Sequence, residues 1–244
     1  MLYLSLAGRR ATTSMASDPS TRIAFPPGTR LAVIDLDGTL LKGLNAERIF
    51  YLDLLIHGRV GVFKMAGFLL SLVGDTLRLG FRKAIATNTR ILKGRTAAEI
   101  RQWAGAFGQG FLRNAVPEDL RAKILSLRSE GCRIVLLSGS LQVLVDQLKD
   151  RLQAEVLIGT DLEVVGGNLT GRKTGTFAYG RMKPEALFER IDPGGIDWAG
   201  SWALADRLSD LPVLELVGHP VAVHGDRKLR RLARKRGWEI IGRR

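Results

Sequence analysis

The hydrophobic positions of this 244-residue chain gather in short runs that alternate with segments of helical period. Apolar, often β-branched runs between turn residues predict buried strands at Leu31–Ile34, Cys132–Leu137, Val156–Ile158, Trp202–Ala205 and Val221–Val223. Helices are predicted over Pro117–Glu130, Leu141–Leu152 and Lys183–Ile191, and a β-hairpin over Asp161–Gly171, which alternates around Gly166-Gly167. Strands that alternate with helices predict an α/β fold, with a parallel sheet covered by helices on both faces.

Residues 42–115 interrupt this alternation. They are typical of helix throughout and contain no strand-like run. Four large apolar residues recur there at helical spacing and indicate a side that faces a core: Ile100, Trp103, Phe107 and Phe111. We interpret residues 42–115 as a helical domain inserted into an α/β body made of residues 31–41 and 116–244.

The N-terminal residues 1–30 contain Ser, Thr, Arg and a Pro26-Pro27 pair with little periodicity, which predicts a flexible tail. Their apolar start, Leu2–Ala7, is shorter than the roughly 7–15-residue core of a secretory signal, so a targeting segment and a misassigned start are both open. A single cysteine, Cys132, excludes an intramolecular disulfide. No run of about 18 uninterrupted apolar residues occurs, so we expect no transmembrane helix and predict a cytoplasmic protein.

Positive charge is concentrated in two segments, and the chain carries a net +13. Residues 42–115 contain twelve Lys or Arg against four Asp or Glu, and residues 225–244 contain nine against two. Such charge predicts attraction to nucleic acid, an acidic membrane surface or a phosphorylated substrate. Within the basic insert, Val60–Val73 is nearly all apolar, which leaves a core helix, a homodimer contact or an interfacial segment as interpretations.

Acidic side chains directly follow the first predicted strand. Asp35 and Asp37 alternate with Leu36, so both carboxylates can face one pocket if the strand continues. Two close carboxylates need a cation between them or a raised pKa on one of them. Mg²⁺ is the hard, oxygen-liganded ion that fits such a pair.

Further polar residues follow the later predicted strands, either directly or one loop beyond. Ser138-Gly139-Ser140 precedes a helix, where a hydroxyl and free N–H groups form a phosphate site. Lys183 opens the next helix and is suited to pair with a phosphate or a carboxylate. Asp206 can add a metal ligand, while Asp210 can orient waters or Lys183. Each feature alone has an ordinary structural explanation, but together they lie where ligands bind in open α/β sheets.

In this order the motifs resemble the haloacid dehalogenase (HAD) superfamily, in its phosphoserine-phosphatase-like branch, subfamily IB. The similarity covers about residues 31–241 and is carried by DLDGTL, LLSGS, MKPEAL, the hairpin stretch IGTDLEVVGGNLTG, and the segment that begins ADRLSDLP. It implies a Rossmann-like core with a helical cap inserted at residues 42–115.

The resemblance also implies a Mg²⁺-dependent phosphatase that works through an aspartyl-phosphate. Asp35 would be the nucleophile, and Asp37 would protonate the leaving oxygen and then activate water. Mg²⁺ would be held by the side chain of Asp35, the backbone carbonyl of Asp37 and Asp206. The phosphoryl group would be bound by Thr39, Ser138, Gly139 and Lys183, with Asp210 supporting the site from behind.

Two positions depart from the family pattern. Phosphoserine phosphatases carry a Glu nine residues after the nucleophile that binds the substrate amine, whereas this chain has Leu44 there and its nearest acid is Glu47. We therefore favour another small phosphorylated metabolite as substrate. Arg207 adds a permanent cation beside Asp206, either to hold a highly anionic phosphate or to point to solvent.

Two alternative functions follow from the charge distribution. The basic, apolar insert suits a lipid phosphate, of the phosphatidylglycerophosphate or lysophosphatidate type, met through peripheral contact with an anionic membrane. The second alternative is a non-catalytic nucleic-acid-binding protein on this scaffold. Its basic segment, residues 227–244, contains only Trp238 as an aromatic residue for base stacking, so we expect no nucleic-acid partner.

Overall fold

The computed structural model describes residues 12–14, 22–79 and 89–242. Its sheet contains β1 (Thr12–Ser14), β2 (Leu31–Ile34), β3 (Arg133–Leu141), β4 (Val156–Val165), β5 (Asn168–Thr174), β6 (Trp202–Ala205), β7 (His219–Val223) and β8 (Glu239–Ile241). Six strands run parallel in the order β4-β3-β2-β6-β7-β8, while β1 and β5 pair antiparallel with β4. The chain thus winds outward from β2 in one direction and from β6 in the other, so the switch in strand order lies between these two neighbours.

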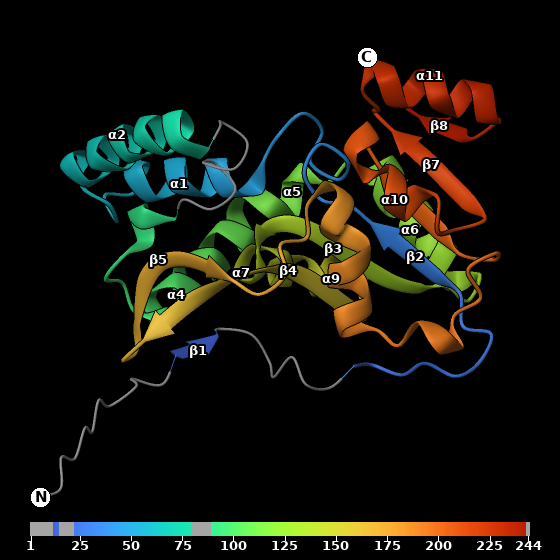
Figure 1. Cartoon of the computed structure of the whole chain (residues 1–244), viewed down its shortest axis with the longest axis horizontal. Coiled ribbons are helices and arrows are strands. Elements are labelled where there is room, and N and C mark those ends of the chain that lie inside the picture. The colour runs from blue at the N-terminus through green and yellow to red at the C-terminus, as the bar shows by residue number, and fades with distance from the viewer. Residues whose placement is uncertain (1–11, 15–21, 80–88, 243–244) are drawn as a thin grey trace, which may run out of the picture.

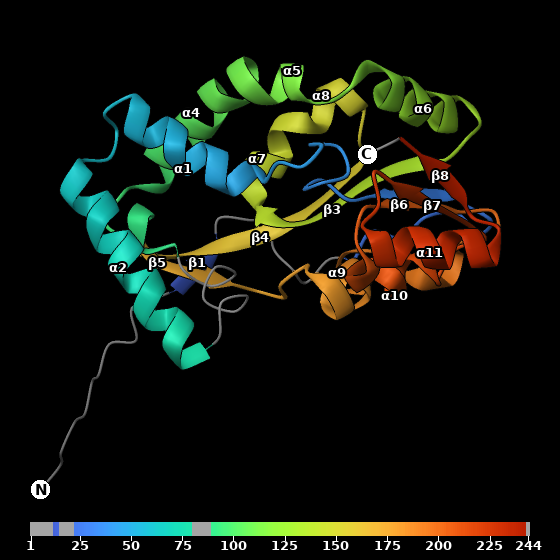
Figure 2. The same cartoon turned by 90° about the horizontal axis from the view of Figure 1, so that it is seen from above.

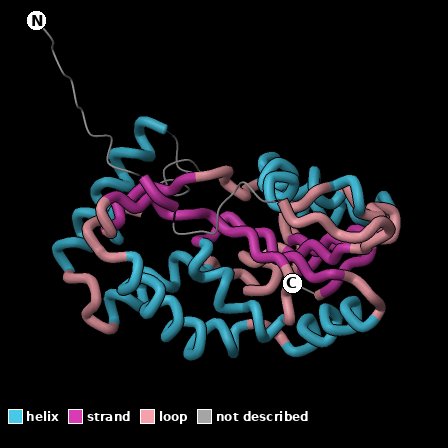
Figure 3. Tube along the Cα trace, turned by 90° about the horizontal axis from the view of Figure 1, so that it is seen from below, coloured by secondary structure: helices cyan, strands magenta, loops and turns pink. Residues whose placement is uncertain are grey.

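Helices cover both faces of this sheet, as Figures 2 and 3 show. The longer ones are α1 (Ala46–Ile56), α2 (Val62–Leu79), α4 (Ala97–Phe107), α6 (Glu118–Ser129), α9 (Lys183–Arg190) and α11 (Arg227–Arg236). Shorter turns of helix are η1 (Arg90–Leu92), η2 (Gly108–Leu112), α5 (Arg113–Ala115), α7 (Gln142–Val145), η3 (Asp146–Leu148), α8 (Lys149–Leu152), η4 (Gly180–Met182), η5 (Pro193–Gly195), η6 (Leu208–Asp210) and α10 (Leu211–Leu214). The predicted α/β fold is therefore confirmed.

The fully buried strand β2 shows why the sheet needs helices on both sides. Its side chains alternate between two hydrophobic cores: Ala32 and Ile34 belong to one, and Leu31 and Val33 to the other. Helix α6 packs into the first core and helices α9 and α11 into the second. Because successive strand residues point to opposite faces, a continuous apolar run is stable only when both faces are covered.

The described part of residues 42–115 contains helices and loops, as predicted, and its one isolated bridge joins Thr96 to Asn168. Figure 1 shows α1, α2 and α4 together at one end of the molecule, away from α11. Ile100 and Phe107 are fully buried, and the rings of Phe50 and Phe107 lie 5.4 Å apart. We call residues 42–115 the helical insert.

The insert is joined to the β4–β5 hairpin by main-chain hydrogen bonds. Gly94 N donates to Leu169 O, Leu169 N donates to Arg95 O, and Ala97 N donates to Gly167 O. The hairpin turns at Gly166-Gly167, as predicted, since Val165 pairs with Asn168. Both turn glycines have positive φ, the conformation that such turns require.

The apolar segment Val60–Val73 is not a core helix. Val60 itself is buried, but most of the residues from Val62 onward form an exposed face of α2. None of the described helices is both long enough and apolar enough to cross a membrane.

The prediction of a flexible tail over residues 1–30 falls mostly outside the described residues. Within the described part, Thr12–Ser14 pairs with β4, and Ile23 N donates to Arg190 O. Thr29 N donates to Gly195 O, so residues 22–30 lie along the core beside α9 and η5.

Candidate active site

The predicted site residues meet at the switch in strand order. Asp35 directly follows β2, and its backbone N–H donates to Leu204 O of β6, which extends the ladder by one residue. Asp206 directly follows β6, and Ser138 lies near the end of β3. The carboxyl ends of three adjacent parallel strands thereby place these side chains in one small volume.

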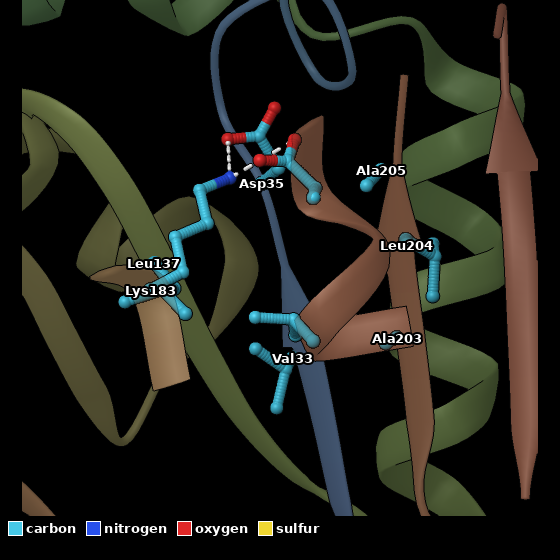
Figure 4. A pocket seen from close by; sticks show the side chains of 9 residues that line it. Val33, Asp35, Leu137, Lys183, Ala203, Leu204 and Ala205 are labelled. Atoms are coloured by element: carbon cyan, nitrogen blue, oxygen red, sulfur yellow. Dashed lines mark hydrogen bonds and ion pairs between the residues drawn. The ribbon is translucent and has the colours of Figure 1, made fainter. Parts of the chain in front are cut away.

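Lys183 supplies a buried positive charge to this volume. Its Nζ lies 2.6 Å from Asp35 Oδ1 and 3.2 Å from Asp210 Oδ2, and all three side chains are buried. Figure 4 shows its side chain running past Leu137 toward Asp35. Burial alone would lower the pKa of Lys183, but the charges of Asp35 and Asp210 outweigh it and raise that pKa above its usual value. Lys183 therefore remains protonated at neutral pH.

Asp37 is held by donors from two separate parts of the chain. Its Oδ1 accepts from Ala46 N at 2.7 Å, and its Oδ2 accepts from the hydroxyls of Ser140 at 2.6 Å and Ser138 at 3.2 Å. Burial, followed by the nearby charge of Asp35, raises the pKa of Asp37 to about 6, although the hydrogen bonds oppose that rise. A carboxyl with this pKa can exist in both protonation states near neutral pH.

Three carboxylates form a cluster of the kind that binds a divalent cation. One oxygen each from Asp35, Asp206 and Asp210 lies within 4.8 Å of the others. Asp206 Oδ1 is buried and has no hydrogen-bond partner among the described residues. Burial, and then repulsion by Asp35, raise the pKa of Asp206 to about 7. A hard cation among these oxygens would bind the orphaned atom and relieve the repulsion, so the donor set fits Mg²⁺.

The side chains differ somewhat from the predicted division of roles. Asp210, expected behind the metal, contributes an oxygen to the carboxylate cluster and also binds Lys183. Burial raises the pKa of Asp210 to about 6, against the lowering effect of Lys183. The carboxylate of Asp37 accepts three hydrogen bonds, so both of its side-chain oxygens are already paired within the protein. Arg207 lies partly in solvent with its Nε 3.4 Å from Asp206 Oδ2.

Gly38 forms the wall against which Asp206 packs. Its φ is +91°, and a Cβ added there would lie 2.1 Å from Asp206 Oδ2. No side chain fits in that space, so the DLDGTL motif needs glycine at this position for contact as well as for conformation. The sequence indicated the motif but not this contact, which depends on a residue 168 positions away.

The residues predicted to bind phosphate line the same volume. Thr39 Oγ1 donates to Asp35 Oδ2 at 2.9 Å, so Lys183 and Thr39 hold the two oxygens of Asp35. Ser138 and Ser140 do not cap a helix, because β3 continues through an irregular stretch to Leu141 and their hydroxyls donate to Asp37. At Gly139 a Cβ would lie 3.4 Å from both Ala178 O and the Phe177 ring, which favours a small residue there.

Asp226 is a supporting residue that sequence reasoning missed. Its backbone N–H donates to Asp206 O at 2.7 Å, and its Oδ2 accepts from Leu208 N at 3.2 Å. Its Oδ1 caps α11 through Leu229 N at 2.8 Å. One side chain therefore fixes both the loop after β6 and the start of the basic helix. The only local signal was an Asp immediately before a helical segment, which many capping residues share.

Residues 32–215 match the family described as haloacid dehalogenase-like hydrolase. The chain belongs to this family. It is 29% identical over 221 residues to the phosphoserine phosphatase SerB1 of Mycobacterium tuberculosis, an alignment that covers 87% of this chain and 70% of that protein. It is 28% identical over 215 residues to the inhibition of morphological differentiation protein of Streptomyces azureus, covering 86% and 77%.

Solved structures agree on the fold. A protein of unknown function from Bordetella pertussis Tohama I superposes with a TM-score of 0.73 at 24% identity, over 88% of this chain and 99% of that one. A phosphoserine phosphatase with a phospho-aspartyl intermediate analogue superposes with a TM-score of 0.59 at 19% identity, over 89% and 95%. The predicted family, its phosphoserine-phosphatase-like character and the hydrolase class are confirmed. The names of the relatives agree with a phosphoric monoester hydrolase.

The contact between Gly38 and Asp206 generates a test with a matched control. We predict that Gly38→Ala removes hydrolase activity and weakens Mg²⁺ binding, because the new Cβ displaces the Asp206 carboxylate. Gly43→Ala is the control, since Gly43 also has positive φ but a Cβ there meets nothing within 4 Å. Mg²⁺ titration by calorimetry gives the affinity, and thermal unfolding measures the backbone strain that the two variants share. Equal loss of Mg²⁺ affinity in both variants would contradict the contact argument.

Proposed function

We propose that this protein is a Mg²⁺-dependent phosphatase that hydrolyses a small phosphomonoester through an aspartyl-phosphate intermediate. The observation that carries the proposal is the pairing of two differently held carboxylates. Asp35 Oδ1 is held by the ammonium of Lys183 at 2.6 Å, whereas Asp37 has a raised pKa and is oriented by two serine hydroxyls. This arrangement supports Asp35 as the nucleophile and Asp37 as the proton donor.

In the first step, a carboxylate oxygen of Asp35 attacks phosphorus while the bond from phosphorus to the leaving oxygen breaks. Asp37 donates its proton to that oxygen, so the product leaves as an alcohol. Lys183, the Ser138 hydroxyl and the backbone N–H of Gly139 bind the transferring phosphoryl oxygens. Thr39 and Lys183 hold the Asp35 carboxylate in a fixed orientation before attack.

In the second step, the ionised Asp37 takes a proton from a water molecule that attacks the phosphorus of the aspartyl-phosphate. The acyl–phosphate bond breaks, and Asp35 and inorganic phosphate are released. Asp35, Asp206 and the backbone carbonyl of Asp37 would hold Mg²⁺, which would supply positive charge to offset that of the carboxylates and the phosphate. Asp210 keeps the Lys183 ammonium in position through its ion pair in both steps.

The surroundings of Asp37 support a substrate other than phosphoserine. Leu44, which stands where an amine-binding Glu is expected, is 42% exposed and apolar. Glu47 is buried and already accepts from Lys173 Nζ at 2.8 Å and Tyr51 OH at 2.6 Å. Its carboxylate is therefore paired within the protein, so a substrate amine would have to displace Lys173.

We further propose that residues 31–41 and 116–244 act as the catalytic core and that the helical insert selects the substrate as a cap. The start of α1 supports this division, because Ala46 N binds the carboxylate of Asp37 and so joins the insert to the site. A cytoplasmic location and a homodimer remain predictions. The lipid-phosphate alternative also remains, favoured by the exposed apolar side chains of α2.

A substrate panel tests the proposed class. We predict that soluble phosphomonoesters without an amine are hydrolysed with higher kcat/KM than phosphoserine, because Glu47 is paired with Lys173. The panel measures phosphate release from sugar phosphates, phosphoserine and micellar lysophosphatidate under the same Mg²⁺ concentration. A preference for phosphoserine would contradict the proposed class, and a preference for lysophosphatidate would establish the lipid alternative.

The nucleophile assignment is tested by Asp35→Asn. We predict complete loss of turnover, because an amide does not attack phosphorus, while thermal unfolding remains cooperative. Asp150→Asn is the matched control, since Asp150 is an exposed acid on α8, and it should leave the rate unchanged. EDTA should stop the wild type, and acid-quenched wild type should carry phosphate from a labelled substrate. A surviving Mg²⁺-dependent rate in Asp35→Asn would overturn the assignment.

The role of Asp37 is tested by varying the leaving group. We predict that Asp37→Asn slows alkyl phosphates by about 10²–10⁴-fold, because the leaving oxygen loses its proton donor. An aryl phosphate with a nitrophenol leaving group needs that proton less, so its first step should suffer less. Single-turnover kinetics on both substrates measure that step. Ser140→Ala, which removes one donor to Asp37, should show a smaller loss with the same selectivity, and equal losses for both substrates would refute the role.

A further inference from the structure

Exposed apolar surface is concentrated on the helical insert. Of the twelve large hydrophobic side chains that are exposed in the described part of the chain, nine belong to residues 44–77. Six of them lie on α2: Val62, Phe63, Leu69, Leu70, Val73 and Leu77. Phe63 is 94% exposed and Leu77 is 84% exposed, so burial of these side chains contributes almost nothing to the stability of the fold.

Helix α2 turns most of its polar side chains, with Met65 and Phe68, toward the protein, and its outer face is mostly apolar. Lys64 Nζ donates to Lys93 O at 2.8 Å, and Asp75 pairs with Arg90 at 3.4 Å. Phe68 packs beside Tyr51 with the ring centroids 5.6 Å apart. Among its described side chains the exposed ones are Val62, Phe63, Ala66, Leu69, Leu70, Val73, Leu77 and Arg78, with Gly67 and Gly74 between them. The outer face therefore has one charge, at the C-terminal end.

Charge around this face identifies its partner. Residues 42–115 carry twelve Lys or Arg and four Asp or Glu. All four acids are already engaged: Glu47 with Lys173, Asp53 with Arg59, Asp75 with Arg90 and Glu99 with Arg95. Arg78 is exposed at the C-terminal end of the face and Lys93 is exposed just after η1, and no ion pair joins either of them to an acid within the described residues. The insert presents apolar surface together with uncompensated positive charge.

A second copy of this chain would not match that surface. Two inserts placed face to face would bring a net +8 against a net +8, with no free acid on either side to form pairs. An anionic lipid surface supplies both an apolar interior for Phe63, Leu70 and Val73 and negative headgroups for Arg78 and for other basic side chains of the insert. A helix of 18 residues is about 27 Å long, which is long enough to lie along such a surface.

We propose that the outer face of α2 is a membrane-docking surface that binds anionic bilayers with the helix in the plane of the interface. Docking is independent of the proposed phosphatase chemistry, because no residue of the face is part of the carboxylate cluster. Docking would bring the enzyme to a surface rich in anionic headgroups and phosphorylated lipids, with the insert next to them. The face thus determines where the enzyme works, whichever phosphomonoester it hydrolyses.

The test measures binding of the full chain to vesicles of phosphatidylglycerol and of phosphatidylcholine by co-sedimentation. We expect binding to phosphatidylglycerol alone, and weaker binding at about 1 M salt than at about 0.1 M, where the Debye length is longer. Replacing Phe63, Leu70 and Val73 together with Ser should lower the partition coefficient at least roughly tenfold. These side chains are exposed, so the variant should unfold at the wild-type temperature.

A second triple variant tests whether the other basic segment, helix α11, accounts for the binding. Lys228, Arg231 and Lys235 are exposed along α11, so the triple change to Gln removes charge far from α2 and should keep most of the binding. Absence of wild-type binding, or equal binding by wild type and the α2 variant, overturns the proposal. The proposal is also overturned if the wild type is a dimer without lipid and the α2 variant is a monomer. The face would then be a subunit interface. Phosphatase assays on an aryl phosphate are run separately, so failure of the chemistry is distinguishable from failure of docking.

Discussion

Mutual repulsion of buried carboxylates is the constraint on which the rest of the site depends. Four aspartates lie at the switch between β2 and β6, and the buried Lys183 pairs with only two of them, Asp35 and Asp210. Burial is the main reason that the pKa rises to about 6 for Asp37 and Asp210 and to about 7 for Asp206. Such an arrangement disfavours folding, so it persists only because two hydrophobic cores fix the strand ends from both faces. The same repulsion favours binding of a cation. A bound cation would in turn attract a phosphate.

The site could be predicted to the extent that it depends on strand ends. Asp35, Ser138 and Asp206 each follow an apolar run, and parallel strands bring their carboxyl ends to one edge. The pairing of Ser138 and Ser140 with Asp37 could not be predicted, because it depends on an irregular stretch of β3 that delays the next helix. The contact of Gly38 with Asp206 was equally hidden, since sequence patterns report local conformation and not a close approach between distant loops.

The fold was predictable for strands that are buried on both faces of the sheet. It was not predictable for the short strands or for the exposed helix α2. Continuous apolar runs located five strands of the parallel sheet, while the three-residue strands β1 and β8 carry too few apolar positions to be recognised. For α2 the pattern left three interpretations open, and only the core helix is excluded by the structure. Apolar composition indicates that a segment prefers to leave water, and it does not indicate whether the protein interior or another apolar phase receives it. Only the exposure of Phe63 and Leu77 distinguishes these cases.

The main-chain bonds between the insert and the β4–β5 hairpin have a mechanical consequence. β4 is one continuous strand whose first half lies in the parallel sheet and whose second half carries the hairpin. Because Leu169 bonds through both its N–H and its carbonyl to the insert, swinging the insert away would break these bonds or bend β4. The insert is therefore braced by a rigid arm of the sheet and has no free hinge on that side. Rotation of the insert as a whole would therefore cost the three main-chain hydrogen bonds of Gly94, Leu169 and Ala97.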